Sequence, residues 1–356
     1  MPISIGEACL QASLFLEAQG VGEPRANAEL LLMHQLGLSR AELLRDLRDP
    51  FPQGQMEAWA ALMERKAAGE PVQYIIGEQW FYGLSFAVTP AVLVPRPETE
   101  LLVEAVLEAA DRLWPEAAGG EAVSGEAVSG EAVSGEAVSG EAVSGEAVSG
   151  EAAGGDAASG DTVDREAVLV SDGPTVVDVG TGSGAIGVTL AALRPRWRVC
   201  ASDLSPDALA VARSNAARHD AAERMAFVQG DLLGPFAVPR PEEDAAAGNL
   251  AGLRIDVLVS NPPYIPASDI PGLQPEVRDY EPRLALDGGD DGLTPYRRMM
   301  EQLPLLAVLP RIVAFELGQG QADAVAAMLR EYGAWSEVRI ITDYAGIDRH
   351  VLAVLS

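Results

Sequence analysis

From Thr175 onward, short apolar runs alternate with segments of helical spacing, and this alternation constrains the fold more than any other feature. The first run, residues 175–179, leads into a glycine-rich turn and then into a helical pattern over residues 186–193. Later apolar runs occupy residues 198–201, 226–228, 256–259 and 312–315. Strands that alternate with helices predict a doubly wound α/β fold, in which helices cover both faces of a mostly parallel sheet.

A polar residue follows closely after each of the later runs. These residues are Asp203, Asp231, Asn261 and Glu316. The carboxyl ends of parallel strands meet at one edge of such a sheet, and ligands bind in the crevice there. We therefore expect these four side chains to lie on the same edge.

The turn after the first strand has the sequence Asp178-Val-Gly180-Thr181-Gly182-Ser183-Gly184. Glycine lets the backbone turn sharply and lets a ligand approach without interference from a Cβ atom. Residues 182–187 also match G-x-G-x-x-G, and Asp203 follows about 20 residues later, as a dinucleotide site requires. Because Asp203 can accept hydrogen bonds from the ribose of NAD or of S-adenosylmethionine, the turn alone leaves both cofactors open.

Asp231, after the third strand, is suited to bind an adenine amino group. Its apolar neighbour Leu232, together with Leu204 after the second strand, can enclose an adenine ring from its two faces. An aspartate at the end of a loop is also common as a turn residue or a helix cap. Both interpretations remain open for Asp203 and for Asp231.

The tetrapeptide Asn261-Pro262-Pro263-Tyr264 separates the two cofactors. An amide nitrogen is a poor nucleophile, because its lone pair is delocalised with a rotation barrier of roughly 18–20 kcal/mol. The Asn261 side-chain oxygen and the Pro262 carbonyl can each accept one N–H, and these bonds strengthen as positive charge develops on nitrogen. Two prolines fix the backbone, and Tyr264 offers a flat face to a planar group.

A hydride-transfer enzyme has no use for this tetrapeptide. It predicts an S-adenosyl-L-methionine-dependent methyltransferase that acts on a planar, amide-type nitrogen, with Asn261, Pro262 and Tyr264 as catalytic residues. Residues 261–264 together would bind the substrate. This chemistry needs neither a metal nor a strong general base.

The N-terminal 72 residues predict a small helical domain. Ser4 with Glu7, and Ser39 with Glu42, both fit the capping box that begins a helix. Residues 73–96 contain short apolar runs at 74–76, 80–82 and 85–88 separated by glycines, which indicate strands and a β-hairpin connector. A helix is predicted from about Pro97, where the methyltransferase domain (97–356) begins.

A five-residue repeat, Glu-Ala-Val-Ser-Gly, occurs six times over residues 121–150. One valine per repeat cannot bury enough surface to offset the entropy of ordering. We predict that residues 116–166, approximately, form a disordered insertion without a chemical role.

Charge and cysteine content narrow the function further. The net charge is −28, and the body of the chain remains at −17 when residues 115–166 are left out. Such acidity disfavours nucleic acid as a stable partner. Cys9 and Cys200 are too few and too far apart for a disulfide framework or a zinc site. With no apolar run long enough for a bilayer and no basic N-terminal leader, we expect a cytoplasmic protein without a membrane partner.

Taken together, the motifs resemble the release-factor glutamine N5-methyltransferase family (PrmC/HemK type). Besides the glycine turn and Asn-Pro-Pro-Tyr, the resemblance includes residues 95–100, 280–286, 287–293, 315–318 and 343–349. It covers nearly all of the chain except the repeat tract. Asn-Pro-Pro-Tyr also occurs in adenine-specific DNA methyltransferases, whereas the other blocks are specific to this family.

The resemblance implies a class I, Rossmann-like, seven-stranded methyltransferase domain with a small N-terminal helical bundle that binds the substrate. It implies methylation of the glutamine amide in the Gly-Gly-Gln motif of class-1 peptide chain release factors. Carried over by position, Gly180 through Gly184, Asp203 and Asn261 would contact the cofactor, and the full cofactor-binding set adds Asp178, Leu204, Asp231 and Leu232. Members of the family can carry an aromatic residue after the third-strand aspartate, where this chain has Leu232.

Two other functions are compatible with parts of this pattern. A nucleic-acid adenine methyltransferase would share Asn-Pro-Pro-Tyr, but it would need a basic groove and a further recognition domain. A non-catalytic adaptor could retain the fold, but it would have no need of the intact glycine turn, Asp203 and Asn261. Cofactor binding and the identity of the methyl acceptor distinguish these alternatives.

Overall fold

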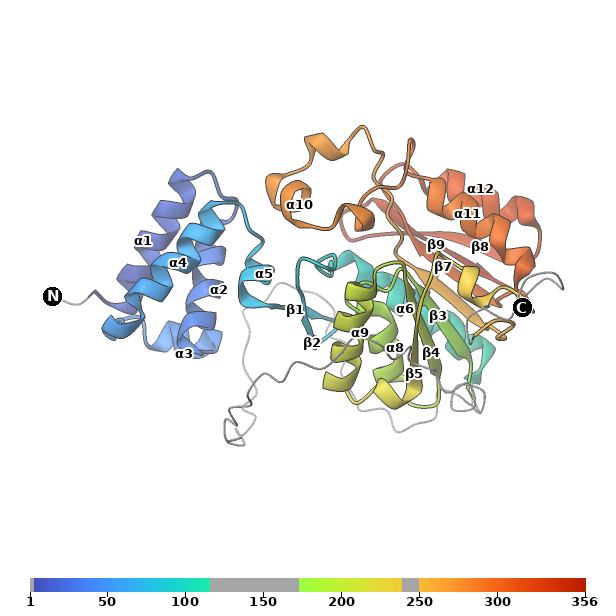
Figure 1. Ribbon diagram of the computed structural model, residues 1–356, viewed down its shortest axis with the longest axis horizontal. Coiled ribbons are helices and arrows are strands. Elements are labelled where there is room, and N and C mark those ends of the chain that lie inside the picture. Colours follow the sequence, from blue (N-terminus) through green and yellow to red (C-terminus); the bar gives the residue numbers. More distant parts are fainter. Residues whose placement is uncertain (1–2, 116–172, 239–249) are drawn as a thin grey trace, which may run out of the picture.

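The computed structural model describes residues 3–115, 173–238 and 250–356 (Figure 1). A helical N-terminal part is followed by a two-stranded hairpin and then by a seven-stranded sheet. The insertion predicted at about 116–166 lies outside the described residues. Within the described part of the chain, no helix is both long and apolar enough to cross a membrane.

Five helices form the N-terminal part. They are α1 (Ile5–Ala18), α2 (Pro24–Leu36), α3 (Arg40–Arg45), α4 (Met56–Ala67) and α5 (Val72–Ile76). Both predicted capping boxes are confirmed: the Ser4 and Ser39 hydroxyls accept from the amides of Glu7 and Glu42, whose carboxylates accept in return. Leucines at positions such as 16, 31 and 43 are buried between the helices and form a separate apolar core.

The strand expected over residues 74–76 is wrong, because this segment is helix α5. Val72 and Ile75 have helical spacing and are buried in the core of the N-terminal part. Tyr74 is buried on another side, where its hydroxyl donates to the Val92 carbonyl at 2.6 Å. Pro71 precedes this short helix, and Gly77 ends it in a left-handed conformation. Apolar residues on two sides of one turn look like a buried strand, so the sequence pattern misleads here.

The two later strands of this region pair as predicted. Strands β1 (Glu78–Phe81) and β2 (Leu84–Ala87) form an antiparallel hairpin. Phe81 and Phe86 are buried in the main core, with ring centroids 6.0 Å apart. The hairpin therefore packs against the body of the sheet domain.

The main sheet has the strand order β5-β4-β3-β6-β7-β9-β8. Its parallel strands are β3 (Thr175–Val179), β4 (Arg198–Asp203), β5 (Met225–Gln229), β6 (Val257–Ser260) and β7 (Ile312–Glu316). The last two, β8 (Glu337–Thr342) and β9 (Asp348–Val354), run antiparallel to their neighbours. Each of the five parallel strands predicted for this sheet is present, with ends shifted by two residues at most.

Helices cover both faces of the sheet, which confirms the doubly wound fold (Figure 1). On one face α6 (Glu98–Leu113), α8 (Ala185–Leu193) and α9 (Pro206–Arg218) share an apolar core with the hairpin. On the other face lie α11 (Thr294–Gln302) and α12 (Ala322–Tyr332). The strand order reverses between β3 and β6, and such a switch point opens a crevice at the carboxyl ends of the strands.

Candidate active site

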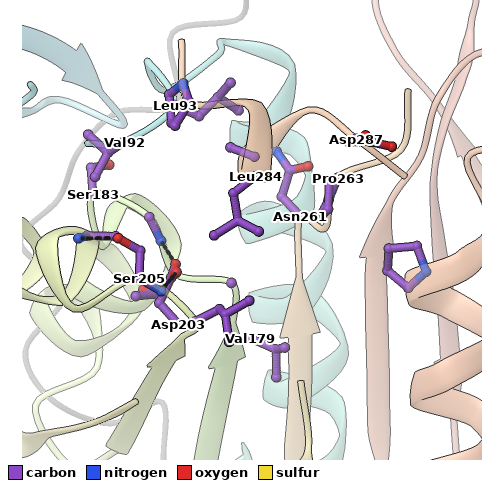
Figure 2. A pocket seen from close by; sticks show the side chains of 18 of the residues that line it. Val92, Leu93, Val179, Ser183, Asp203, Ser205, Asn261, Pro263, Leu284 and Asp287 are labelled. Carbon is purple, nitrogen blue, oxygen red and sulfur yellow. Dashed lines mark hydrogen bonds between the residues drawn. The ribbon is translucent and has the colours of Figure 1, made fainter. Parts of the chain in front are cut away.

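A cavity of about 710 Å³ opens at the carboxyl ends of β3, β4 and β6. Figure 2 shows Asp203 and Ser205 across this cavity from Asn261 and Pro263. Segments near residues 90–96 and 282–289 complete its walls. The predicted site residues that line it are Gly180, Thr181, Gly182, Ser183, Asp203, Leu204, Asp231, Leu232, Asn261 and Pro263.

The glycine turn presents its backbone to this cavity. Gly180 and Gly182 have φ angles of 68° and 56°, a conformation that favours glycine. Gly184, also left-handed, lies behind the turn, where a Cβ would be 3.0 Å from Val188 Cγ2 and 3.2 Å from Ala212 Cβ. Gly184 does not line the cavity. It allows α8 and α9 to pack closely.

Asp178, a predicted cofactor residue, also lies outside the cavity wall. Its carboxylate is fully buried beneath the turn, where Oδ2 accepts from Thr181 Oγ1 at 2.6 Å and from the Gly187 amide at 2.9 Å. Burial raises the pKa of Asp178 to about 6. These contacts show that Asp178 stabilises the conformation of the turn.

Asp203 connects the end of β4 to the same turn. Its Oδ2 accepts from the Gly182 amide and its Oδ1 from the Ser205 amide, both at 2.9 Å. Burial raises the pKa of this carboxyl group. A carboxylate can accept about four hydrogen bonds, so Asp203 retains acceptor capacity on the cavity side.

Asp231 lies at the cavity margin and pairs with Arg298 of α11. Next to it, Leu232 has a φ angle of 52°, an uncommon conformation for a residue with a side chain. The adjacent Leu233 is fully buried, and its amide donates to Gln302 Oε1 at 2.9 Å. Anchoring of Leu233 in the core therefore turns Leu232 toward the cavity, while Leu204 on another wall is 48% exposed.

The Asn-Pro-Pro-Tyr segment divides between two spaces. Asn261 lines the main cavity and also an adjoining recess of about 80 Å³, and Tyr264 lines the recess alone. Pro262 is buried and lines neither space. The Tyr264 backbone carbonyl accepts from Gln321 Nε2 at 2.9 Å. Burial raises the pKa of the Tyr264 phenol. Tyr264 is thus held as a neutral, fixed ring beside the Asn261 amide.

Three features of the site carry no role in the sequence-based assignment. An ion pair of 2.6 Å between Arg96 and Glu281 borders the recess. Thr99 and Glu316 form a buried hydrogen bond behind Asn261. In the sequence, these residues belong to the blocks at 95–100, 280–286 and 315–318, and Glu316 is also one of the four polar residues expected at the carboxyl edge of the sheet.

The third feature is Asn215 of α9, which connects the hairpin to the glycine turn. Its side chain bonds both the amide and the carbonyl of Ala87, at 2.8 and 3.0 Å. It also donates to the Ser183 carbonyl at 2.8 Å. Asn215 is fully buried in the middle of a helix, where an asparagine gives no pattern to recognise.

Comparison with known proteins yields two family models. The PrmC N-terminal domain matches residues 7–77, and a methyltransferase domain matches residues 176–250. The second match agrees with the seven-stranded topology and identifies the fold as the expected class I methyltransferase fold.

The chain is similar to curated proteins over nearly its whole length. It is 37% identical to the release factor glutamine methyltransferase of Moorella thermoacetica, covering 99% of this chain and 98% of that one. The protein of the same name from Bacillus subtilis is 35% identical, with the same coverage. Among solved structures, the N-terminal domain of human METTL16 in complex with SAH is 14% identical, with a TM-score of 0.42 over 77% of each chain.

Proposed function

The chain belongs to the family of release factor glutamine methyltransferases, and from this premise we propose its reaction. It transfers the methyl group of S-adenosylmethionine to the side-chain amide of the glutamine in the Gly-Gly-Gln motif of a class-1 peptide chain release factor. Such a substrate acts in translation, so the reaction belongs in the cytoplasm.

One observation carries the proposal. Asp203 and the glycine turn line the same cavity as Asn261, and Asn261 also lines the recess that contains Tyr264. The residues proposed to bind the cofactor (Asp203 and the glycine turn, the cofactor wall) and those proposed to bind the acceptor (residues 261–264, the acceptor wall) thus adjoin one space. A direct transfer between two bound groups requires this arrangement.

The cavity suits S-adenosylmethionine in shape and in donor chemistry. A Cβ built at Gly180 or Gly182 meets no other atom within 4 Å, so these backbone units are open to a ligand. Asp203 has acceptor capacity for ribose hydroxyls, and Leu204 and Leu232 offer apolar faces for adenine. When bound, this cofactor supplies an electrophilic methyl group on its sulfonium. Asp231 is proposed to accept from the adenine amino group, in competition with Arg298.

The acceptor amide is proposed to bind Asn261 and the Pro262 carbonyl, with Pro263 and Tyr264 beside it. Asn261 Oδ1 accepts no hydrogen bond from any described residue, so it is available for one N–H of the substrate. Positive charge that develops on the nitrogen strengthens this bond, by about 1.5–3 kcal/mol for a charge-assisted interaction. The half-buried, neutral Tyr264 ring offers a planar surface without introducing a charge.

The helical domain, residues 1–72, is proposed to bind the protein substrate, with residues 73–96 connecting it to the methyltransferase domain, residues 97–356. Lys66 of this domain is fully buried and donates to Glu276 of α10 (Pro275–Tyr280), at the wall segment that leads into the site. The Tyr280 hydroxyl donates to the Ala68 carbonyl at 2.9 Å. These contacts support a position of the helical domain beside the recess.

Mass spectrometry of candidate acceptors tests the proposed function. We expect incubation with S-adenosylmethionine and a release factor to add the mass of one methyl group to the Gly-Gly-Gln peptide. Asn261→Ala protein, treated identically, serves as the control. Methylation of DNA or ribosomal RNA with the release factor unmodified would overturn the proposal and favour an adenine methyltransferase. Binding of the cofactor without transfer to any of these would favour a non-catalytic adaptor.

A further inference from the structure

A carboxylate lies buried directly behind the acceptor wall of the site. Glu316, at the end of β7, is only 1% exposed. Its Oε2 accepts from Thr99 Oγ1 at 2.5 Å, and Thr99, in the first turn of α6, is itself 4% exposed. His350, its register partner on β9, places Nε2 3.8 Å from the same oxygen. A buried polar side chain is costly unless it is hydrogen-bonded, so the partners of Glu316 indicate what it does.

The hydrogen bonds continue from Thr99 to the tetrapeptide. Thr99 Oγ1 accepts from Asn261 Nδ2 at 3.3 Å. The Thr99 hydroxyl has a single proton, and it donates this proton to Glu316 Oε2. The lone pairs of the hydroxyl then face Asn261. Glu316 therefore fixes the direction of both hydrogen bonds.

This direction matters because an asparagine amide has two orientations that differ by a half-turn. One presents its oxygen to the substrate and the other presents its NH2 group. The nitrogen of a glutamine side chain carries two N–H donors, so it needs the oxygen. With Nδ2 bound to Thr99, Oδ1 remains for the acceptor.

We propose that Thr99 and Glu316 are positioning residues that hold the Asn261 carboxamide with Oδ1 toward the methyl acceptor. The proposal rests on the proposed function, in which Asn261 accepts from the substrate amide. Glu316 lines neither space, and Thr99, although it lines the cavity, is not among the residues proposed to bind the substrate or the cofactor. They act through Asn261 alone.

The fold explains why three distant sequence segments supply these groups. Asn261 follows β6, and Glu316 ends β7, its parallel neighbour, with Ser260 and Phe315 in register. Thr99 lies in the first turn of α6, near the same edge, and α6 packs against β7. The Tyr296 hydroxyl fixes the strand end by donating to the Glu316 carbonyl at 2.7 Å. The hydrogen-bonded relay formed by Glu316, Thr99 and Asn261 is thus built on rigid elements.

The first test compares Thr99→Val with Thr99→Ser in methyl transfer to a release factor. We expect kcat of the valine variant to fall about tenfold to a hundredfold, as for a misplaced catalytic group. The dissociation constant of S-adenosylmethionine, measured by calorimetry, should change less than about threefold, since valine has nearly the same shape as threonine and Asp203 and the glycine turn are unchanged. Serine keeps the hydroxyl and should recover most of kcat.

Thr189→Val is the matched control, because Thr189 of α8 is also buried and its hydroxyl has no partner among the described residues. Its kcat should equal that of the parent. If Thr99→Val folds poorly, the double variant Thr99→Val/Glu316→Leu replaces both partners with apolar groups, a change that is often nearly neutral for stability. Its kcat should show the same loss.

Nuclear magnetic resonance supplies a readout that altered stability would not move. The chain has four asparagines, so selective 15N labelling gives few side-chain signals, and Asn261→Ala identifies that of residue 261. We expect Thr99→Val to shift or broaden the Asn261 NH2 signals and Thr189→Val to leave them unchanged. Unchanged signals and unchanged kcat in the Thr99→Val protein would overturn the relay. Failure of the parent to methylate any release factor would instead overturn the proposed function.

Discussion

At the scale of single residues, Asp203 and Asn261 have separate tasks on opposite walls of one cavity. Asn261→Ala should abolish turnover with little change in cofactor affinity, because the lost oxygen acts on the reacting nitrogen. Asp203→Ala should weaken S-adenosylmethionine binding by about 1.5–3 kcal/mol, through loss of hydrogen bonds to a charged group. Calorimetry and steady-state kinetics on both proteins measure the difference. The same kinetic signature for the two variants would contradict this division of roles.

Asp178 makes stability depend on pH in an unusual direction for an aspartate. Burial raises its folded-state pKa from 3.8 to about 6, so between these values the folded state binds the proton more tightly than the unfolded chain. Stability is therefore lost as the pH rises through this window, by an amount on the order of 3 kcal/mol. Asp178→Asn keeps an acceptor oxygen but cannot ionise.

Urea unfolding of the parent and Asp178→Asn proteins across about pH 4 to 7 measures this effect. All other groups titrate in both proteins, so the difference between their unfolding free energies isolates Asp178. We expect the unfolding free energy of the Asp178→Asn protein to increase relative to that of the parent as the pH rises. A difference that stays flat, or that shifts in favour of the parent as the pH rises, would contradict a raised pKa.

The same residue shows what the sequence could and could not predict about the site. The strand-turn-helix pattern predicted that residues 178–184 form one unit, and the structure brings most of them to the cavity. It could not distinguish Asp178, which points beneath the turn, from Gly180 and Gly182, which present their backbone to the ligand. That distinction depends on contacts with Gly187 and Thr181, which the fold alone determines.

At the scale of elements, the turn over residues 287–293 supports the acceptor wall by close backbone packing. Gly292 has a φ of 74°, and a Cβ there would lie 2.2 Å from the Tyr264 carbonyl oxygen. Gly292→Ala should displace Tyr264 and lower kcat/KM by about tenfold or more. Gly20, with a φ of 78° and open space around it, provides the control, because Gly20→Ala carries the same backbone strain of about 1–2 kcal/mol.

Kinetics and thermal unfolding of both glycine variants separate the two effects. Each should lose some stability, and only Gly292→Ala should lose activity. Equal activity in the two variants would mean that the turn does not determine the position of Tyr264.

Prediction of elements succeeded where a pattern had only one physical explanation. The strands β3 to β7 are buried on both faces and are followed by helices or turns, so their apolar runs are unambiguous. Helix α5 was misread because Val72, Tyr74 and Ile75 are buried against two different cores at once. A local pattern does not contain the partner that buries each side chain. For the same reason, the sequence predicts the place of Glu316 at the sheet edge but not its hydrogen bond to Thr99.

At the scale of the whole molecule, the insertion between α6 and β3 joins the sheet domain at the edge away from the site. Helix α6 ends at Leu113, and the adjacent Trp114 packs under Arg311, which precedes β7. At the other end, Thr175 begins β3 and donates to Asp256, which precedes β6. Both attachment points therefore lie at the amino ends of the strands, whereas the cavity lies at their carboxyl ends.

Deletion of residues 119–160 should consequently leave methyl transfer nearly intact. Shortening a flexible connection changes its closure entropy by about 0.6 kcal/mol per halving of length, so stability should rise slightly. The deletion also removes eight carboxylates, whose repulsion of an acidic partner is screened within about 8 Å at physiological salt. Measurement of kcat/KM for a release factor, in parent and deletion proteins at low and physiological salt, tests both points. A loss beyond about tenfold at both salt concentrations, or about 1.4 kcal/mol, would show that the repeats contact the substrate or the site.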